Sequence, residues 1–99
     1  MAAKRKFDEN LETRAMVLQG HSRPVRMIKF SDDGDLLFSA SDDKNICLWR
    51  TFDGEKIGVY PGTSACKSIA VTRDVKFLFG AFVAEGFKVF ICETGEEVS

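Results

Sequence analysis

The side chains in this chain that could carry out chemistry are few and widely separated. There is one histidine, His21, and three cysteines, Cys47, Cys66 and Cys92, which form no C-x-x-C pair. A lone histidine with no second His or Cys nearby is a poor metal site. An odd number of cysteines without pairing also argues against a disulfide framework or a zinc knuckle. We therefore expect three reduced, half-buried thiols in a cytosolic or nuclear protein, with no metal and no cofactor.

Two stretches superficially resemble ligand-binding loops. Residues 62–68 hint at a phosphate loop, but Pro61 and Cys66 stand where such a loop needs glycine. Residues 32–35 are rich in aspartate, yet the alternating carboxylates and the closing glutamate of a calcium loop are missing. We interpret this segment as a hairpin turn. No Ser/His/Asp or Cys/His arrangement for nucleophilic catalysis stands out, and we predict that the chain is not an enzyme.

The composition is that of an ordinary globular domain and excludes several classes of protein. Hydrophobic residues make up 44% and charged residues 29% of the chain, and the formal net charge is -1. This balance excludes a strongly basic nucleic-acid binder and an acidic disordered tail. No apolar run is long enough to span a membrane or to form a signal peptide. The 9 phenylalanines, against 1 Tyr and 1 Trp, predict a large buried apolar surface.

Two groups of basic residues lie near the start of the chain. The basic cluster at residues 4–6 could be a nuclear localisation signal, but we assign residues 1–15 to a solvated, disordered polar tail. Further on, Arg23, Arg26 and Lys29 could touch RNA or an acidic partner. We favour solvated charge for these three side chains, with RNA contact at most peripheral.

The elements that position these residues are short strands. Turn-forming residues recur about every ten residues, which indicates an all-β fold, and no segment keeps a helical apolar stripe. The runs 36–38 and 77–79 are apolar at every position, which predicts strands covered on both faces. We predict seven strands from these patterns. They cover residues 25–30, 36–40, 45–49, 56–60, 67–71, 77–81 and 87–91.

The sequence repeats itself internally with a period of about 41 to 42 residues. When the sequence is aligned with itself at this offset, residues 30–33 match residues 71–74 and residues 36–38 match residues 77–79. Such a period is typical of WD repeats, each of which forms a four-stranded blade of a β-propeller. We therefore predict an all-β fold of about two antiparallel WD40-type blades from a presumed seven-bladed propeller. The propeller region covers residues 16–99, with repeat one at about 20–60 and repeat two at about 62–99.

The segment from Gly20 to Arg50 resembles a WD repeat, with Arg50 where the final Asp usually stands. In that family a His, a Ser or Thr, an Asp and a Trp form a hydrogen-bonded tetrad inside the blade. An imidazole can donate through one nitrogen and accept through the other, whereas an indole only donates. We expect a structural network rather than a catalytic one, with Ser41 as the alternative to Ser39. The resemblance assigns the tetrad to His21, Ser39, Asp43 and Trp49.

The second repeat departs from this pattern at every tetrad position. Its matching residues are Thr63, Gly80, Ala84 and Phe90. Because all the polar partners are lost together, no buried donor is stranded. We expect apolar packing to hold this repeat instead. The residues expected to supply it are Phe77, Phe79, Phe82, Phe87 and Phe90.

Residues 16–98 are also similar to a narrower family, the WD-repeat subunit i of eukaryotic translation initiation factor three. The specific segments are residues 17–21, 34–39 and 54–60, whereas Pro61 to Thr63 depart from the second Gly-His of the family. The resemblance implies a non-catalytic, cytoplasmic scaffold that supports mRNA recruitment and scanning. Its implied partners are subunits b and g of the factor and the small ribosomal subunit, with no small-molecule substrate and no direct membrane contact.

Two other functions remain open. Residues 21–25 are shared with the kinase-receptor-associated WD scaffold, which implies a signalling role. An enzyme subunit with its active site in the propeller channel would need convergent His, Asp or Glu residues at the strand starts, and the two repeats show none.

The length of the repeat also leads to an expectation about the architecture. We expect residues 16–18 to form the outer strand of another blade and residues 97–99 to stop where the outer strand of the second blade begins. Both ends would then lack strand partners. Since two blades do not close a propeller, we expect the chain to be part of a longer protein.

Overall fold

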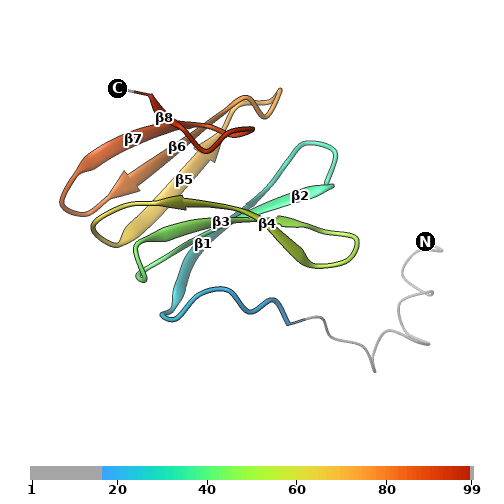
Figure 1. Cartoon of the computed structure of the whole chain (residues 1–99), viewed down its shortest axis with the longest axis horizontal. Coiled ribbons are helices and arrows are strands. Elements are labelled where there is room, and N and C mark those ends of the chain that lie inside the picture. Colours follow the sequence, from blue (N-terminus) through green and yellow to red (C-terminus); the bar gives the residue numbers. More distant parts are fainter. Residues whose placement is uncertain (1–16, 99) are drawn as a thin grey trace, which may run out of the picture.

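The structure, a computed structural model, describes residues 17–98, and every regular element within them is a β-strand. The tail predicted for residues 1–15 lies outside the described residues. The strands form two separate four-stranded antiparallel sheets, each with its strands in sequence order. Figure 1 shows the two sheets stacked one above the other. The first sheet contains β1 (Val25–Phe30), β2 (Leu36–Ser41), β3 (Asn45–Arg50) and β4 (Glu55–Pro61).

The second sheet repeats this arrangement and is complete, which differs from the sequence prediction in one respect. The chain end was expected to lack a strand partner, but β8 pairs with β7, with Glu97 opposite Phe90. Gly95 makes this possible because its positive φ of 79° reverses the chain after Ile91. The strands of this sheet are β5 (Cys66–Val71), β6 (Phe77–Phe82), β7 (Gly86–Ile91) and β8 (Glu97–Val98).

The aspartate-rich segment 32–35 forms the hairpin turn between β1 and β2. The Asp33 carboxylate accepts hydrogen bonds from the Ser31 hydroxyl at 2.7 Å and from the Asp35 backbone N–H at 3.0 Å. Gly34, with φ 79°, provides the left-handed residue that the reversal requires. The Asp33 carboxylate is thus engaged in holding the turn.

The two sheets share the same strand register at positions one repeat apart. Ile28 pairs with Ser39 in the first sheet, and Ile69 pairs with Gly80 in the second. Each sheet also carries a β-bulge at the start of its first strand, directly after Val25 or Cys66. The sequence repeat is therefore a structural repeat, since equivalent residues occupy equivalent places on the two sheets.

The core lies between the two sheets. Phe38 and Ile46 of the first sheet and Leu78 and Phe90 of the second are fully or almost fully buried in one cluster. Tyr60 lies among them, and its hydroxyl donates a 2.7 Å hydrogen bond to the Cys92 carbonyl across the interface. Burial raises the pKa of Tyr60 to about 12, which keeps it a neutral donor.

Burial on both faces was predicted for residues 36–38 and 77–79. The prediction is wrong for residues 77–79. Phe77 and Phe79 are exposed, while Leu78 between them is completely buried. The reason is that β6 has the first sheet on one face only, and no described residue forms a sheet over the other. Within residues 17–98 no helix is long and apolar enough to cross a membrane.

Candidate functional site

The predicted tetrad lies on the face of the first sheet that points away from the second. Its histidine comes from residues 17–24, a segment without strand pairing that we call the strap. The strap passes so close to Trp49 that a Cβ on Gly20 would lie 2.6 Å from the indole Cη2 atom. A glycine before the histidine is thus required for the strap to lie flat on the indole ring.

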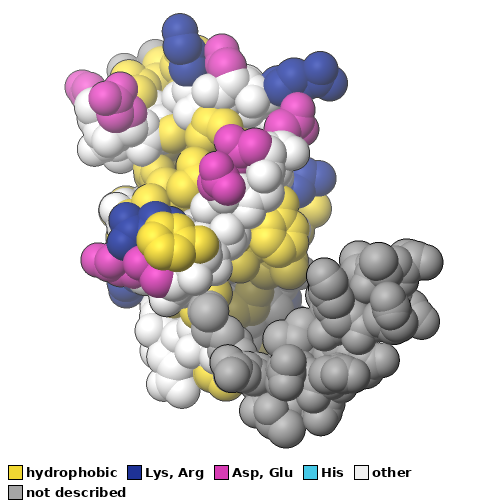
Figure 2. Space-filling model, turned by 90° about the vertical axis from the view of Figure 1, so that its right-hand side faces the viewer, with side chains coloured by type: hydrophobic (Ala, Val, Ile, Leu, Met, Phe, Trp, Pro, Cys, Tyr) yellow, Lys and Arg dark blue, Asp and Glu magenta, His cyan; other side chains and the backbone are white. Residues whose placement is uncertain are grey.

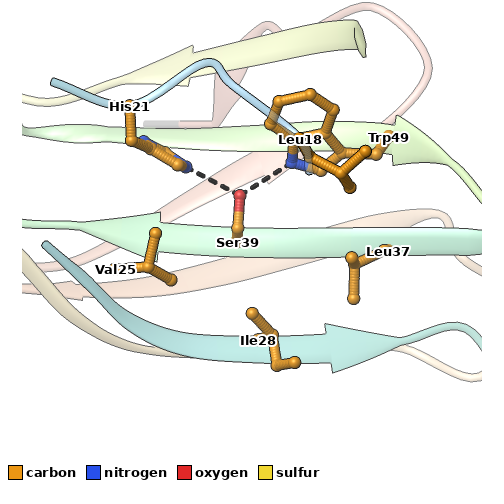
Figure 3. Close-up of a pocket in the computed structure, with 7 residues that line it drawn as sticks. All are labelled: Leu18, His21, Val25, Ile28, Leu37, Ser39 and Trp49. Carbon is orange, nitrogen blue, oxygen red and sulfur yellow. Dashed lines mark hydrogen bonds between the residues drawn. The ribbon is translucent and has the colours of Figure 1, made fainter. Parts of the chain in front are cut away.

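The four side chains form one continuous hydrogen-bonded chain. Trp49 Nε1 donates to the Ser39 hydroxyl at 2.8 Å, and this hydroxyl lies 2.7 Å from His21 Nε2. His21 Nδ1 lies 2.9 Å from the Asp43 carboxylate. Figure 3 shows the serine between the imidazole and the indole. For a neutral imidazole, the serine hydroxyl donates to Nε2 and the Nδ1–H donates to the carboxylate.

Ser41, the alternative to Ser39, has a different place. Its hydroxyl donates to the backbone carbonyls of Arg23 and Pro24 and accepts from the Asp43 N–H at 3.0 Å. Ser41 therefore ties the end of the strap and the β2–β3 turn to the sheet edge, and Ser39 is the serine that joins the imidazole to the indole.

The electrostatics of the site favour an ionised Asp43. Although burial acts to raise the pKa of this carboxyl, hydrogen bonds from His21 and from the backbone N–H groups of Asn45 and Ser22 lower it overall. Both side chains of the His21–Asp43 pair are almost fully buried. The indole N–H, the Ser39 hydroxyl and both ring nitrogens of His21 have partners within the four side chains. The Asp43 carboxylate also accepts from the backbone N–H groups of Ser22 and Asn45, so the arrangement can hold the strap on the sheet.

The second repeat has a polar cluster that sequence reasoning missed. Ala84 occupies the position equivalent to Asp43, as the repeat alignment predicts, but the next residue, Glu85, supplies a carboxylate instead. It accepts hydrogen bonds from the Thr63 backbone N–H at 2.8 Å and from the Ser64 hydroxyl at 2.6 Å. Hydrogen bonds from Ser64 and Thr63 lower the pKa of Glu85 to about 2.

The sequence did contain a signal for this cluster. The upstream glycines Gly20 and Gly62 match at an offset one residue longer than the rest of the repeat. The same longer offset sets Thr63 against His21 and Glu85 against Asp43, so the hydroxyl and the carboxylate stand where the imidazole and the aspartate stand in the first repeat.

The second repeat does pack through an apolar core, as expected, but the Glu85 cluster adds polar contacts to it. The expectation for the phenylalanines is wrong in part. Phe82 and Phe90 are buried, but Phe77, Phe79 and especially Phe87 are exposed. The physical reason is again the alternation of a strand: residues on one face pack against the first sheet, and residues on the other do not.

The three basic residues singled out from the sequence differ in their surroundings. Arg26 Nε donates to Asp42 at 2.9 Å, and Lys67 of the second sheet donates to the same carboxylate at 2.9 Å. Hydrogen bonds from Arg26 and Lys67 hold the pKa of Asp42 well below its usual range. Arg23 and Lys29 are exposed. The carboxylate of Asp42 thus links the two sheets at their edge.

The thiols were expected to be half-buried, and the structure places them deeper. Cys47, Cys66 and Cys92 are all free and buried, and burial raises the pKa of each thiol. Burial disfavours the thiolate form of each. Among residues 17–98 there is no group of three or more His, Cys, Asp or Glu side chains that could hold a metal ion.

Comparison with known proteins agrees with this architecture. Residues 12–50 match the family model described as "WD domain, G-beta repeat". Among solved structures, the crystal structure of RRP9 WD40 repeats superposes with a TM-score of 0.78 at 23% identity, covering 85% of this chain and 27% of that one. The structure of U3-55K gives 0.79 at 22% identity, with 85% and 28% covered. At this identity the likeness shows the fold.

The curated relatives carry a consistent name. Eukaryotic translation initiation factor 3 subunit I from Aspergillus terreus is 38% identical over 84 residues, which is 84% of this chain and 25% of the relative. The protein of the same name from Xenopus tropicalis is 33% identical over 87 residues, 87% of this chain and 27% of the relative. The chain thus spans about a quarter of the length of these relatives. Its fold is that of WD40-type β-propeller blades, and its sequence is similar to subunit I of eukaryotic translation initiation factor 3.

Proposed function

We propose that the chain acts as a non-catalytic interaction scaffold in eukaryotic translation initiation, as part of the initiation factor 3 assembly in the cytoplasm. The observation that carries this proposal is the identity of 32% to 38% to relatives named as subunit I of that factor, over most of this chain. Its partners are subunits b and g of the factor and, through them, the small ribosomal subunit. In that assembly the chain supports mRNA recruitment and scanning.

The geometry of the first repeat supports a scaffold role over catalysis. His21, the only histidine of the chain, contacts Ser39 through one ring nitrogen and Asp43 through the other. The imidazole has no ring nitrogen left to bind a substrate or to move a proton to one. We propose that the tetrad is structural and that it keeps the strap on the sheet.

A reconstituted factor tests the proposal directly. Purified initiation factor 3 lacking its own subunit I is incubated with the tagged 99-residue chain, and the tag is then captured. We expect subunits b and g to be recovered together with the chain. A chain that is folded by circular dichroism and yet recovers neither subunit would reject the proposal.

The same capture distinguishes the signalling alternative. If the chain belonged to a kinase-receptor scaffold, it would recover a receptor or kinase tail offered in competition and leave subunits b and g unbound. The matched control for both arms is the Phe52→Glu variant, because Phe52 is exposed in the β3–β4 turn and contributes to neither sheet face.

A further inference from the structure

One contact between the two sheets is made by a sulfur atom. The side chain of Met27, on β1, reaches the second sheet, where its Sδ atom accepts a hydrogen bond from the Ile69 backbone N–H at 3.3 Å and another from the Ser68 hydroxyl at 3.4 Å. Both donors belong to β5, which lies against β1. Because a thioether sulfur has two lone pairs, these two donors take up its whole accepting capacity.

The sulfur is particular to this contact and is not part of the repeat. Met27 and Ser68 occupy equivalent positions, since each is the first paired residue after the bulge of its sheet and each lies opposite an alanine, Ala40 or Ala81. The repeat thus carries a thioether in the first sheet and a hydroxyl in the second. Both sides of the contact lie within residues 17–98, so its geometry depends on no further part of the protein.

Met27 lies at the boundary between the core and water. Its side chain packs against the hydrophobic core and is half-buried, and its partner Ser68 is exposed. The other sulfur atoms of residues 17–98 belong to the three buried thiols. Within this range Met27 therefore carries the sulfur that a small oxidant in the solvent reaches most easily.

Two other polar links between the sheets are ion pairs at the surface. Lys67 donates to Asp42 at 2.9 Å, and Arg73 Nε lies 3.3 Å from the Asp32 carboxylate. Exposed pairs of this kind contribute little to stability. Figure 2 shows one side of the molecule, where acidic and basic groups surround a central band of hydrophobic side chains. The contact between the sheets thus depends mainly on packed side chains, and Met27 is the one that joins β1 to the backbone of β5.

The contact leaves no room for an oxygen atom on the sulfur. When a thioether reacts with hydrogen peroxide, a sulfur lone pair attacks one peroxide oxygen, the O–O bond breaks, an S–O bond forms and water leaves. The sulfur is oxidised by two electrons and the peroxide is reduced by two. Because each lone pair of Met27 faces a donor only 3.3 or 3.4 Å away, the new oxygen would lie between the sulfur and that donor. The sulfoxide therefore fits only when β1 and β5 move apart.

We propose that Met27 is a site of reversible oxidation, at which a peroxide converts the thioether to the sulfoxide and thereby loosens the contact between the two sheets. The sulfoxide is polar and favours the separated arrangement, in which water hydrates its oxygen. Reduction by a methionine sulfoxide reductase restores the thioether and the contact. This switch needs no partner and is separate from the proposed role in translation initiation.

Peroxide treatment of the folded 99-residue chain tests the proposal. Mass spectrometry of proteolytic fragments identifies the oxidised residue, and circular dichroism measures the midpoint of thermal unfolding. We expect Met27 to gain one oxygen atom and the midpoint to fall by about 4–8 °C, the shift that the loss of one hydrogen bond produces in a domain of this size. Methionine sulfoxide reductases A and B are expected to restore the midpoint. Dithiothreitol alone, which reduces oxidised thiols but no sulfoxide, is expected to leave it low.

Three variants assign the effect to one sulfur. Met27→Leu keeps the size of the side chain and removes the sulfur, so its midpoint is expected to stay unchanged after peroxide. Met16→Leu is the matched control and is expected to show the full shift, because Met27 is intact. Met27→Gln places a polar side chain of similar length at the contact, and we expect it to have the lowered midpoint without any peroxide.

The opposite results overturn the proposal. Met27 that stays unoxidised at a peroxide concentration sufficient for free methionine is not such a site, and oxidation that leaves the midpoint unchanged is not a switch. An equal fall in Met27→Leu would assign the effect to another group, and a fall that dithiothreitol reverses would assign it to the thiols. An unchanged midpoint in Met27→Gln would also contradict the proposal. If Met27→Leu does not fold, the reductase and dithiothreitol treatments of the unmodified chain still separate the methionine from the thiols.

Discussion

At the scale of single residues, Ser39 is the centre of the first repeat. Its hydroxyl is the one group that contacts both the Trp49 indole and the His21 imidazole. Buried donors whose partner is removed lose their hydrogen bond and cannot regain one from water. The network therefore depends on this hydroxyl more than on either ring.

Ser39→Ala is expected to reduce the free energy of unfolding by about 1–3 kcal/mol, because it leaves the buried indole N–H without a partner. Urea unfolding followed by Trp49 fluorescence measures the change. Ser22→Ala is the matched control, since it removes an exposed hydroxyl from the same strap and should change stability by less than about 0.5 kcal/mol. Equal effects of the two substitutions would show that the tetrad hydroxyl has no special role.

At the scale of elements, the turns and the strap decide which faces meet. The hairpin of residues 32–35 and the seven strands could be predicted from turn residues and apolar runs, because these signals are local. The repeat period extended the prediction to the pairing of strands within each sheet. The exposure of Phe77 and Phe79 could not be predicted from this pattern, because an apolar run indicates what can be buried, and only the packed structure decides which face is covered.

The Glu85 cluster shows a second limit of the sequence. The repeat alignment without gaps sets Ala84 against Asp43 and hides the carboxylate one residue later. A glutamate side chain is longer than an aspartate side chain by one methylene, so it still reaches Thr63 and Ser64 from the next position of the turn. Side-chain reach of this kind is not visible in a position-by-position comparison.

Glu85→Gln is expected to lower the free energy of unfolding at neutral pH and to lower it less at acidic pH. The folded pKa of about 2 lies below the ordinary value of a glutamate, so ionised Glu85 stabilises the fold above about pH 4. This contribution is lost as the pH falls toward the folded pKa.

Urea unfolding of the two proteins at a series of pH values measures the difference. We expect it to be largest near pH 7 and to shrink below about pH 4. Glu93→Gln, at an exposed carboxylate, is the control. A difference between Glu85→Gln and the unmodified chain that grows on acidification would contradict the assigned role of this carboxylate.

Gly80 determines how closely the two sheets approach. A Cβ at this position would lie 2.8 Å from Phe82 Cε1 and 2.9 Å from Ile46 Cδ1. Gly80→Ala is therefore expected to cost about 1–3 kcal/mol through overpacking, measured by thermal or urea unfolding. Gly58→Ala is the matched control, because its Cβ would be at an ordinary 3.5 Å from Leu48 Cβ. A harmless Gly80→Ala would mean that the sheets are farther apart than the structure has them.

At the scale of the whole molecule, one contact between unlike faces joins the two sheets. The face of the first sheet that bears Ile46 packs against the face of the second that bears Gly80, and the hydroxyl of Tyr60 joins the sheets.

Nuclear Overhauser spectroscopy on methyl-labelled chain under monomeric conditions tests this pairing of faces most directly. We predict cross-peaks from the Ile46 Cδ1 methyl to the Gly80 Hα protons and the Phe82 ring, with none from Ile46 to the Trp49 ring on the opposite face of its own sheet. Absence of the Ile46–Gly80 contact, with cross-peaks instead between the Trp49 face and the second sheet, would contradict it.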